Sequence, residues 1–115
     1  MKDRHYRPIA GCPVEVTLDL IDGRWKGVVL FHLLSEECLR FNQLHRRLPG
    51  ITQRLLTKQL RELEAAGLVT RTVYAEVPPR VEYRPTSEGE SLRPLLDLAE
   101  AWGRQRIARM SESNA

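Results

Sequence analysis

The sequence has no long apolar stretch and very little cysteine. None of its apolar runs approaches the ~20 residues of a membrane-spanning helix, and the N-terminus MKDRHYRP lacks the apolar segment of a signal peptide. Two cysteines, Cys12 and Cys38, are too few for a disulfide scaffold and lack the partners of a zinc site. These absences favour a cytoplasmic protein that neither binds a metal nor associates with a membrane.

Patterns that indicate catalysis are missing as well. His5, His32 and His45 stand without the Ser, Cys or carboxylate spacing of a catalytic triad or metal site, and no glycine-rich phosphate loop is present. His32 falls within an apolar stripe, where we expect a half-buried, hydrogen-bonded histidine. We therefore expect a protein that is not an enzyme and that needs no cofactor.

Positive charge, in contrast, is concentrated in one segment. The chain has 115 residues, 42% of them hydrophobic, and a net charge of only +3, as expected of one small globular domain. Between Arg40 and Arg61, however, six arginines and lysines occur with no Asp or Glu. Such a concentration is typical of a nucleic-acid-binding surface, although a charge run can also be a simple solvated face.

The clearest helical pattern, from Ile51 to Gly67, lies largely within this segment. At 3.6 residues per turn, five apolar residues share an arc of roughly 140°: Leu55, Leu56, Leu60, Leu63 and Ala66. The opposite side carries Arg54, Lys58 and Arg61. Thr52 is suited to cap the N-terminus and Gly67 to end the helix. Gln59 falls inside the apolar arc, so either a backbone group satisfies its amide or the helix is slightly rotated.

The preceding residues predict a partner for this helix. We expect helices over 13–21, opened by Pro13, and over 24–35, with an apolar stripe of Trp25, Val28, Val29, His32 and Leu33. A short strand over 39–41 and a helix from an Asn42 cap to Leu48 should follow, with Phe41, Leu44 and Leu48 facing inward. Cys38, between apolar neighbours, is expected in the core. Two helices joined by the tight turn Pro49-Gly50, the second one cationic, indicate a helix-turn-helix.

The residues that follow predict a hairpin and a long helix. Segments 68–76 and 80–86, rich in Val, Thr and Tyr, read as two strands joined by a proline-containing loop. A hairpin directly after the cationic helix makes the helix-turn-helix a winged one. Ser87 and Glu90 form a capping box for a final helix over 87–110. Its broad apolar face should pack against a second subunit or, alternatively, against the first helix.

The expected fold is therefore mainly α with a small β-hairpin (α+β), a winged helix-turn-helix with N- and C-terminal dimerisation helices. Residues 1–11 should form a flexible arm and residues 12–110 one domain, with the dimerisation helix at 87–110 and a tail at 111–115. The predicted dimer contacts are Val14, Leu18, Leu92, Leu95, Leu96, Ala99 and Trp102.

Several long strings resemble the HxlR family of winged helix-turn-helix transcriptional regulators. They are Cys12-Pro13-Val14, GRWK (23–26), LRFNQL (39–44), LPGITQRLLTKQLRELEAAGLVTR (48–71) and VPPRVEYRPTSEG (77–89). The resemblance covers roughly residues 12–103. It implies a bacterial or archaeal cytosolic regulator that binds operator DNA as a homodimer, often beside a gene for a detoxification or redox enzyme. The one departure is Pro85, where leucine is commoner.

The expected DNA-binding surface follows from this arrangement. The helix after Thr52 should enter the major groove by its N-terminal half, with Gln53, Arg54, Thr57 and Lys58 at base edges and nearby phosphates. Arg61 should meet phosphate, Arg46 and Arg47 should hold the backbone, and Arg80 at the wing tip should touch the minor groove or its flanking phosphates. The predicted set is Arg46, Arg47, Thr52, Gln53, Arg54, Thr57, Lys58, Arg61 and Arg80. An alternative is a winged-helix protein-interaction module without DNA binding.

Cys12 is a candidate sensor. With Pro13 at the first helical position, Cys12 lies at the N-cap, where the helix dipole favours a thiolate. In some members of the resembled family, the matching cysteine senses oxidants or electrophiles. The other interpretation is a small buried hydrophobic residue. The sequence identifies no small-molecule effector.

Overall fold

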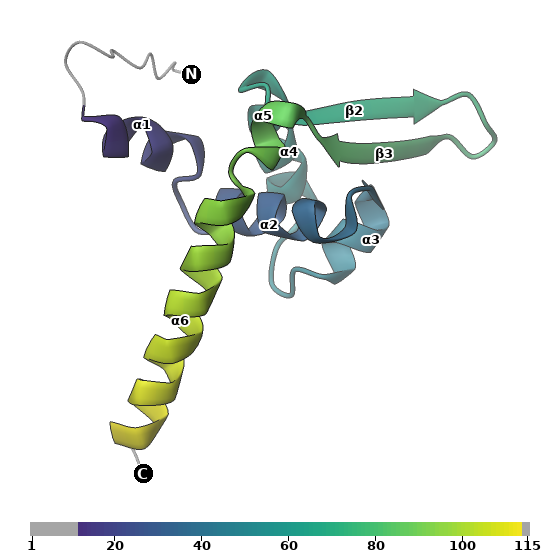
Figure 1. Cartoon of the computed structure of the whole chain (residues 1–115). Helices are drawn as coiled ribbons and strands as arrows, with labels where there is room; N and C mark the ends of the chain where they lie inside the picture. Colours follow the sequence, from purple (N-terminus) through teal and green to yellow (C-terminus); the bar gives the residue numbers. More distant parts are fainter. Residues whose placement is uncertain (1–11, 114–115) are drawn as a thin grey trace.

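The structure is a computed structural model that describes residues 12–113. The predicted arm over 1–11 and the last two residues of the predicted tail lie outside the described residues. The chain forms a small helical body from which a β-hairpin and a long helix project in different directions (Figure 1). None of the helices in this part of the chain is long and apolar enough to cross a membrane.

The first two helices match the predicted positions, but the buried face of the second differs. Helix α1 (Pro13–Leu20) has proline in its first turn and no buried residue. Helix α2 (Lys26–Glu36) buries Val29, Leu30, Leu33 and Leu34. The buried face shares Val29 and Leu33 with the predicted stripe, but its centre is displaced by one residue, about 100° of rotation, so that Val28 is 40% exposed. The segment Val28–Leu34 is apolar almost all around, so periodicity could not choose its inner face.

The helix-turn-helix consists of α3 (Phe41–Arg46) and α4 (Gln53–Ala65). The predicted Asn42 cap is wrong: Arg40 is the capping residue of α3, and its backbone N–H donates to Gln43 Oε1 at 2.8 Å. Gly50 has φ +96°, which a residue with a side chain rarely adopts. Thr52 caps α4 as predicted, because its Oγ1 accepts from the Leu55 N–H at 3.0 Å.

A three-stranded antiparallel sheet, in the order β1-β3-β2, packs beside these helices. The strands are β1 (Leu39–Arg40), β2 (Val69–Tyr74) and β3 (Arg80–Pro85). Leu39 pairs with Tyr83, and both are buried on the inner face. Arg40 pairs with Glu82. Because strand residues alternate between faces, Arg40 and Glu82 lie on the outer face of the sheet.

The predicted single helix over 87–110 is wrong, because the structure divides it. Thr86, rather than Ser87, caps the short α5 (Ser87–Glu90), and its Oγ1 accepts from the Gly89 N–H at 3.0 Å. After a break at 91–92, α6 (Arg93–Ser113) begins. Pro94 explains the break: inside a continuous helix it would remove a hydrogen bond and clash with the Glu90 carbonyl, whereas the first turn of a new helix tolerates proline.

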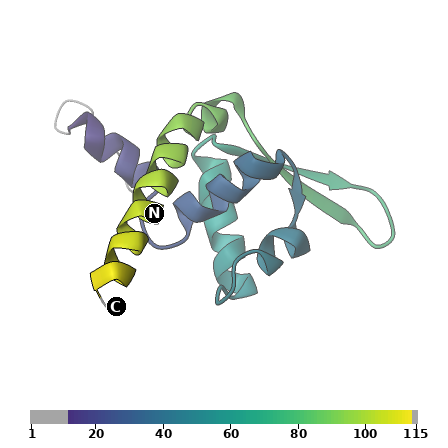
Figure 2. The same cartoon turned by 60° about the horizontal axis from the view of Figure 1, so that its bottom comes forward.

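The core lies between α2, α4 and the inner face of the sheet, and it leaves most of α6 outside. Among the buried core residues, α6 contributes only Leu96, which is 7% exposed. The 21 residues of α6 span roughly 31 Å. Both views show most of that length running away from the helical body (Figures 1 and 2).

Candidate nucleic-acid interface

Helix α4 is held against the domain on one side and presents cations on the other. Leu56, Leu60 and Leu63 are at most 1% exposed. A salt bridge of 2.9 Å between Lys26 Nζ and Glu62 Oε1 ties α4 to the start of α2. The turn before α4 is fixed by a 3.0 Å hydrogen bond between His45 Nε2 and the Ile51 carbonyl. Packing and polar contacts together position the outward face of the helix.

That outward face contains the predicted DNA-binding residues of α4. Gln53, Arg54, Lys58 and Arg61 are all exposed. None of the three cations has an ion-pair partner among residues 12–113. Thr57 is half-buried, and its hydroxyl donates to the Gln53 carbonyl at 2.9 Å. Thr52 is occupied as the N-cap, so its hydroxyl already serves the helix.

The edges of the predicted apolar arc differ from expectation. Ala66 is exposed, because α4 ends at Ala65 and Ala66 occupies the C-cap. Gln59 is half-buried, with no hydrogen bond to another described residue and no buried unpartnered atom. Its amide therefore reaches solvent at the border of the arc, so neither a backbone partner nor a rotated helix is needed.

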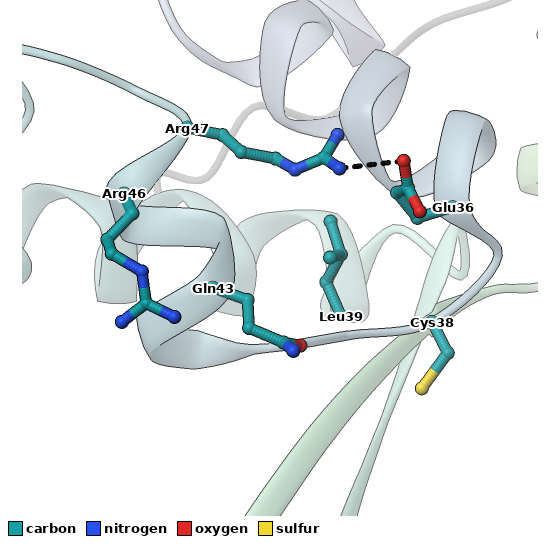
Figure 3. Close-up of a pocket in the computed structure, with 6 residues that line it drawn as sticks. All are labelled: Glu36, Cys38, Leu39, Gln43, Arg46 and Arg47. Carbon is teal, nitrogen blue, oxygen red and sulfur yellow. Dashed lines mark hydrogen bonds and ion pairs between the residues drawn. The ribbon is translucent and has the colours of Figure 1, made fainter.

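The two arginines at the end of α3 have different environments (Figure 3). Arg47 Nη2 donates to Glu36 Oε2 at 2.7 Å, whereas Arg46 is exposed and has no ion pair within the described chain. Glu36 lies just outside the acid-free segment, so charge counting along the sequence did not find this partner. Of the two arginines, Arg46 is the one whose charge is available.

Arg80 is not at the wing tip, which corrects the sequence-based prediction. It is the first residue of β3. The tip is the loop of residues 75–79, which precedes Arg80 in the chain and carries no cation. Arg80 bonds to Glu76 at 3.1 Å and to Glu82 at 3.6 Å, and its guanidinium lies 3.9 Å from the centre of the Tyr74 ring. Its side chain is only 28% exposed. Arg80 therefore holds the base of the wing loop together.

Glu82 is the centre of a polar cluster on the outer face of the sheet. It accepts from Arg84 at 3.1 Å and from the Cys38 thiol at 3.4 Å, besides its contact with Arg80. Burial alone would raise the pKa of Glu82, but the thiol and the two arginines outweigh it and lower that pKa. Burial and the bond to Glu82 raise the pKa of Cys38. Cys38 is thus a half-buried hydrogen-bonded thiol rather than the predicted core residue.

Cys12 and the predicted dimer contacts are mostly at the surface. Cys12 is exposed at the N-cap of α1, so within this chain it is not a buried hydrophobic residue.

Three of the predicted dimer contacts, Val14, Leu18 and Trp102, are 61%, 56% and 62% exposed. Further exposed positions on α6 are Leu95, Leu98, Ala99, Ile107 and Met110. Packing of the final helix on the first one is not what the structure shows, because α1 buries nothing and α6 meets the body through α2.

Two of the predicted dimer contacts serve the core of their own domain. Leu96 is buried, and the half-buried Leu92 packs against the same cluster. Both lie at the start of α6 or just before it, where the chain leaves α5 and passes over α2. The surface that a partner could cover is therefore the rest of α6 together with α1.

No metal site forms within the described chain. Among residues 12–113, no three side chains of His, Cys, Asp or Glu come together in a way that could hold an ion.

His32 is half-buried with its ring edge-on to Phe31, at 5.8 Å between ring centres. Burial, aided by Arg47, lowers the pKa of His32.

Comparison with known proteins identifies the family. The sequence pattern described as "HxlR-like helix-turn-helix" matches residues 20–111. The chain belongs to the HxlR-like helix-turn-helix family. It is 53% identical over 93 residues to YybR, an HTH-type transcriptional regulator of Bacillus subtilis, a match that covers 81% of this chain and 74% of YybR.

Solved structures of HxlR-like relatives share the fold. The redox regulator HypR in its reduced form superposes with a TM-score of 0.81 at 46% identity, over 88% of this chain and 99% of HypR. The reduced transcriptional regulator YodB from B. subtilis gives 0.69 at 33%, over 83% and 93%. The chain is therefore a winged-helix transcriptional regulator, and its family is one of regulators, not of enzymes.

Proposed function

We propose that this HxlR-like protein binds operator DNA sequence-specifically, as a homodimer on an inverted repeat. The observation that carries the proposal is the exposed face of α4, whose Arg54, Lys58 and Arg61 lack acidic partners in the described chain, while the opposite side is anchored in the core by three buried leucines, Leu56, Leu60 and Leu63. A rigid cationic helix after a tight turn fits the major groove of DNA.

The N-terminal half of α4 is the reader in this proposal. Arg54 suits the O6 and N7 atoms of guanine, and Gln53 can pair with adenine. Lys58 and Thr57, one turn further on, reach neighbouring bases or phosphates. Arg61 lies near the C-terminal end of α4, where it meets the phosphate backbone, and Arg46 holds the backbone from α3.

Dimerisation through α1 and α6 would place two readers on one face of DNA. The apolar side chains exposed on these helices, Val14, Leu18, Leu95, Leu98 and Trp102 among them, favour a second copy of the chain as their cover. Two-fold symmetry would set the two α4 helices about 34 Å apart, one turn of DNA. An inverted-repeat operator follows from that spacing.

We further propose that Cys12 makes DNA binding sensitive to oxidants. Its exposure at the start of α1, and the redox regulators HypR and YodB among the relatives, support this role. In the oxidation step, the Cys12 thiols of the two subunits lose two protons and two electrons to diamide, whose N=N bond is reduced to the hydrazine, and one S–S bond forms between the subunits. The bond would shift the dimer and change the spacing of the two α4 helices.

The first test of the proposal is an electrophoretic mobility-shift assay at two salt concentrations, on DNA from upstream of the protein's own gene and its neighbours. We expect a specific complex that weakens steeply with salt, because each phosphate contact releases condensed counterions. Absence of any complex at low salt would instead indicate a winged-helix protein-interaction module.

The role of Cys12 is tested with the Cys12→Ser variant. We expect diamide to change the DNA affinity of the wild-type protein and to leave Cys12→Ser unchanged, with Cys38→Ser as the matched control that still responds. A Cys12→Ser protein that responds to diamide as the wild type does would exclude Cys12 as the sensor.

A further inference from the structure

A cleft of about 530 Å³ separates α3 from the wing loop. One wall consists of Arg40, Phe41, Asn42, Gln43 and Arg46, and the other of residues 76–81. The two walls come from distant parts of the sequence, brought together because β1, which leads into α3, pairs with β3. No sequence pattern indicates this cleft.

The charges around the cleft are unbalanced. The acid in its walls, Glu76, is paired with Arg80, whose charge also meets Glu82. Arg40 and Arg46 have no acidic partner among residues 12–113, although the backbone of Arg40 pairs directly with that of Glu82. Glu82 is already occupied by Arg80 and Arg84. The cleft therefore presents two cations to an anion from outside.

The position of Arg40 is fixed from both sides. Its neighbour Leu39 is 5% exposed and anchors β1 in the core. Its backbone N–H is held by Gln43 Oε1 at 2.8 Å. The exposed Arg40 side chain is thus attached to a backbone that is already held in place. Binding of an anion therefore costs little conformational entropy of the backbone.

The cleft lies between the two elements that approach DNA. In Figure 2, α3 lies between the N-terminal end of α4 and the wing loop. If α4 enters the major groove and the wing approaches the adjacent minor groove, the strand that separates the two grooves must cross the surface between them. Because no Asp or Glu occurs from Arg40 to Arg61, no acidic residue of this segment interrupts the positive charge between the cleft and α4.

We infer that this cleft is a phosphate-binding site that seats the DNA strand between the two grooves, with Arg40 and Arg46 as its cationic ligands. The inference rests on the proposed DNA binding and adds Arg40, which belongs to the cationic segment but not to the predicted set of DNA-binding residues. Because phosphate contacts carry no base information, the site sets the register of α4 and the strength of binding rather than the sequence preference.

The test measures the salt dependence of binding by the full-length protein to a fluorescent duplex of mixed sequence, roughly three helical turns long. The logarithm of affinity falls with the logarithm of salt concentration by about 0.9 per phosphate contact. Arg40→Gln and Arg46→Gln should each reduce this slope by about 0.9, and the double variant by about 1.8. Arg40→Lys, which keeps the charge, should restore it.

Arg24→Gln is the matched control, because it removes one positive charge from the exposed segment between α1 and α2, outside the helix-turn-helix and the wing, where Arg24 lies 4.6 Å from the centre of the Trp25 ring. Its slope should equal that of the wild type. An unchanged slope for Arg40→Gln, with normal thermal unfolding, would overturn the assignment. A wild-type protein that binds no duplex at all would refute the proposed function itself.

A small phosphate compound is the other possible source of the same anion. Thermal unfolding of the wild-type protein with inorganic phosphate, without DNA, distinguishes the two. We expect little stabilisation, because one phosphate meets only two exposed cations. Strong stabilisation that Arg40→Gln abolishes, together with an unchanged DNA slope, would assign the cleft to a small anion and overturn the DNA-strand assignment.

Discussion

The arginines of this protein differ in whether a glutamate of the same chain already neutralises their positive charge. Arg47, Arg80 and Arg84 pair with glutamates, whereas Arg46 and Arg54 have no acidic partner in the described chain. Exposed ion pairs typically contribute only ~0–1 kcal/mol, so Arg47 could exchange Glu36 for a phosphate at small cost. Arg80 also stacks on Tyr74 and is mostly covered, which makes the same exchange costlier.

Arg54→Ala tests the reading of bases by α4. If Arg54 contacts a guanine, the substitution should weaken operator binding by about 1–3 kcal/mol and relax the preference at one position. Titration against operators permuted at single base pairs measures both effects. An equal loss on every permuted operator would reassign Arg54 to a phosphate contact.

Glu82→Gln tests the polar cluster on the sheet through the pH dependence of stability. Because the folded-state pKa of Glu82 is lowered, its ionised form stabilises the fold above its ordinary pKa, near 4.3, and this contribution is lost as pH falls through the folded value. The variant should be less stable than the wild type above pH ~5, and the gap should narrow towards pH ~3.

Urea unfolding at several pH values measures this difference for Glu82. The control is Glu88→Gln, which changes an exposed glutamate with no ion pair among residues 12–113. A difference between wild type and Glu82→Gln that stays constant across the pH range would mean that the charge of Glu82 is not what stabilises the sheet.

At the scale of elements, the sequence predicted α4 and the two strands of the wing better than the side-chain contacts that the wing makes. The pattern of α4 succeeded because polar and apolar residues separate cleanly around it, and Thr52 caps it as expected. The buried face of α2 was predicted one residue away from its actual position. A helix that is apolar almost all around has too few polar residues to mark its outer side. The partners of Arg80 could not be predicted, since pairing with Glu82 and Tyr74 depends on strand register and loop conformation.

Gly89 illustrates a constraint that only the fold reveals. A Cβ at this position would lie 2.3 Å from the Leu68 carbonyl oxygen, which itself accepts from the Thr86 N–H at 3.0 Å. The Leu68 carbonyl cannot move away without breaking this hydrogen bond, which joins the start of α5 to the start of β2. Gly89→Ala should therefore destabilise the domain by about 1–3 kcal/mol, as overpacking does.

Gly103→Ala is the control for this prediction, measured by the same thermal unfolding. A Cβ at Gly103 meets nothing within 4 Å, so alanine should be neutral or stabilise α6 by about 0.5–1 kcal/mol through helix propensity. If Gly89→Ala unfolds at the wild-type temperature, α5 is free to move away from β2 and the junction is looser than the contacts indicate.

At the scale of the whole molecule, a well-packed body that carries the helix-turn-helix contrasts with the apolar side chains exposed on α1 and α6. Trp102 at the middle of α6 is 62% exposed, and buried tryptophans are frequent hot spots of interfaces. Trp102→Ala should weaken self-association by about 2 kcal/mol or more, roughly 30-fold. Ser111→Ala, an exposed change on the same helix, should leave it unchanged.

Sedimentation equilibrium measures the self-association of these variants, and the mobility-shift assay shows its consequence. A Trp102→Ala protein that becomes monomeric should also lose affinity for an inverted repeat while retaining weak binding to a half-site. A monomeric wild-type protein at micromolar concentration would contradict the proposed dimer.

Helix α1 has a consequence for how the protein responds to dilution. It has eight residues and buries none of them, and isolated helices shorter than ~12–15 residues are only marginally stable in water. If a partner supplies its missing contacts, α1 is helical only while the subunits are together. The far-ultraviolet circular dichroism per residue should then decrease as the protein is diluted, so that secondary structure itself reports the concentration of the chain.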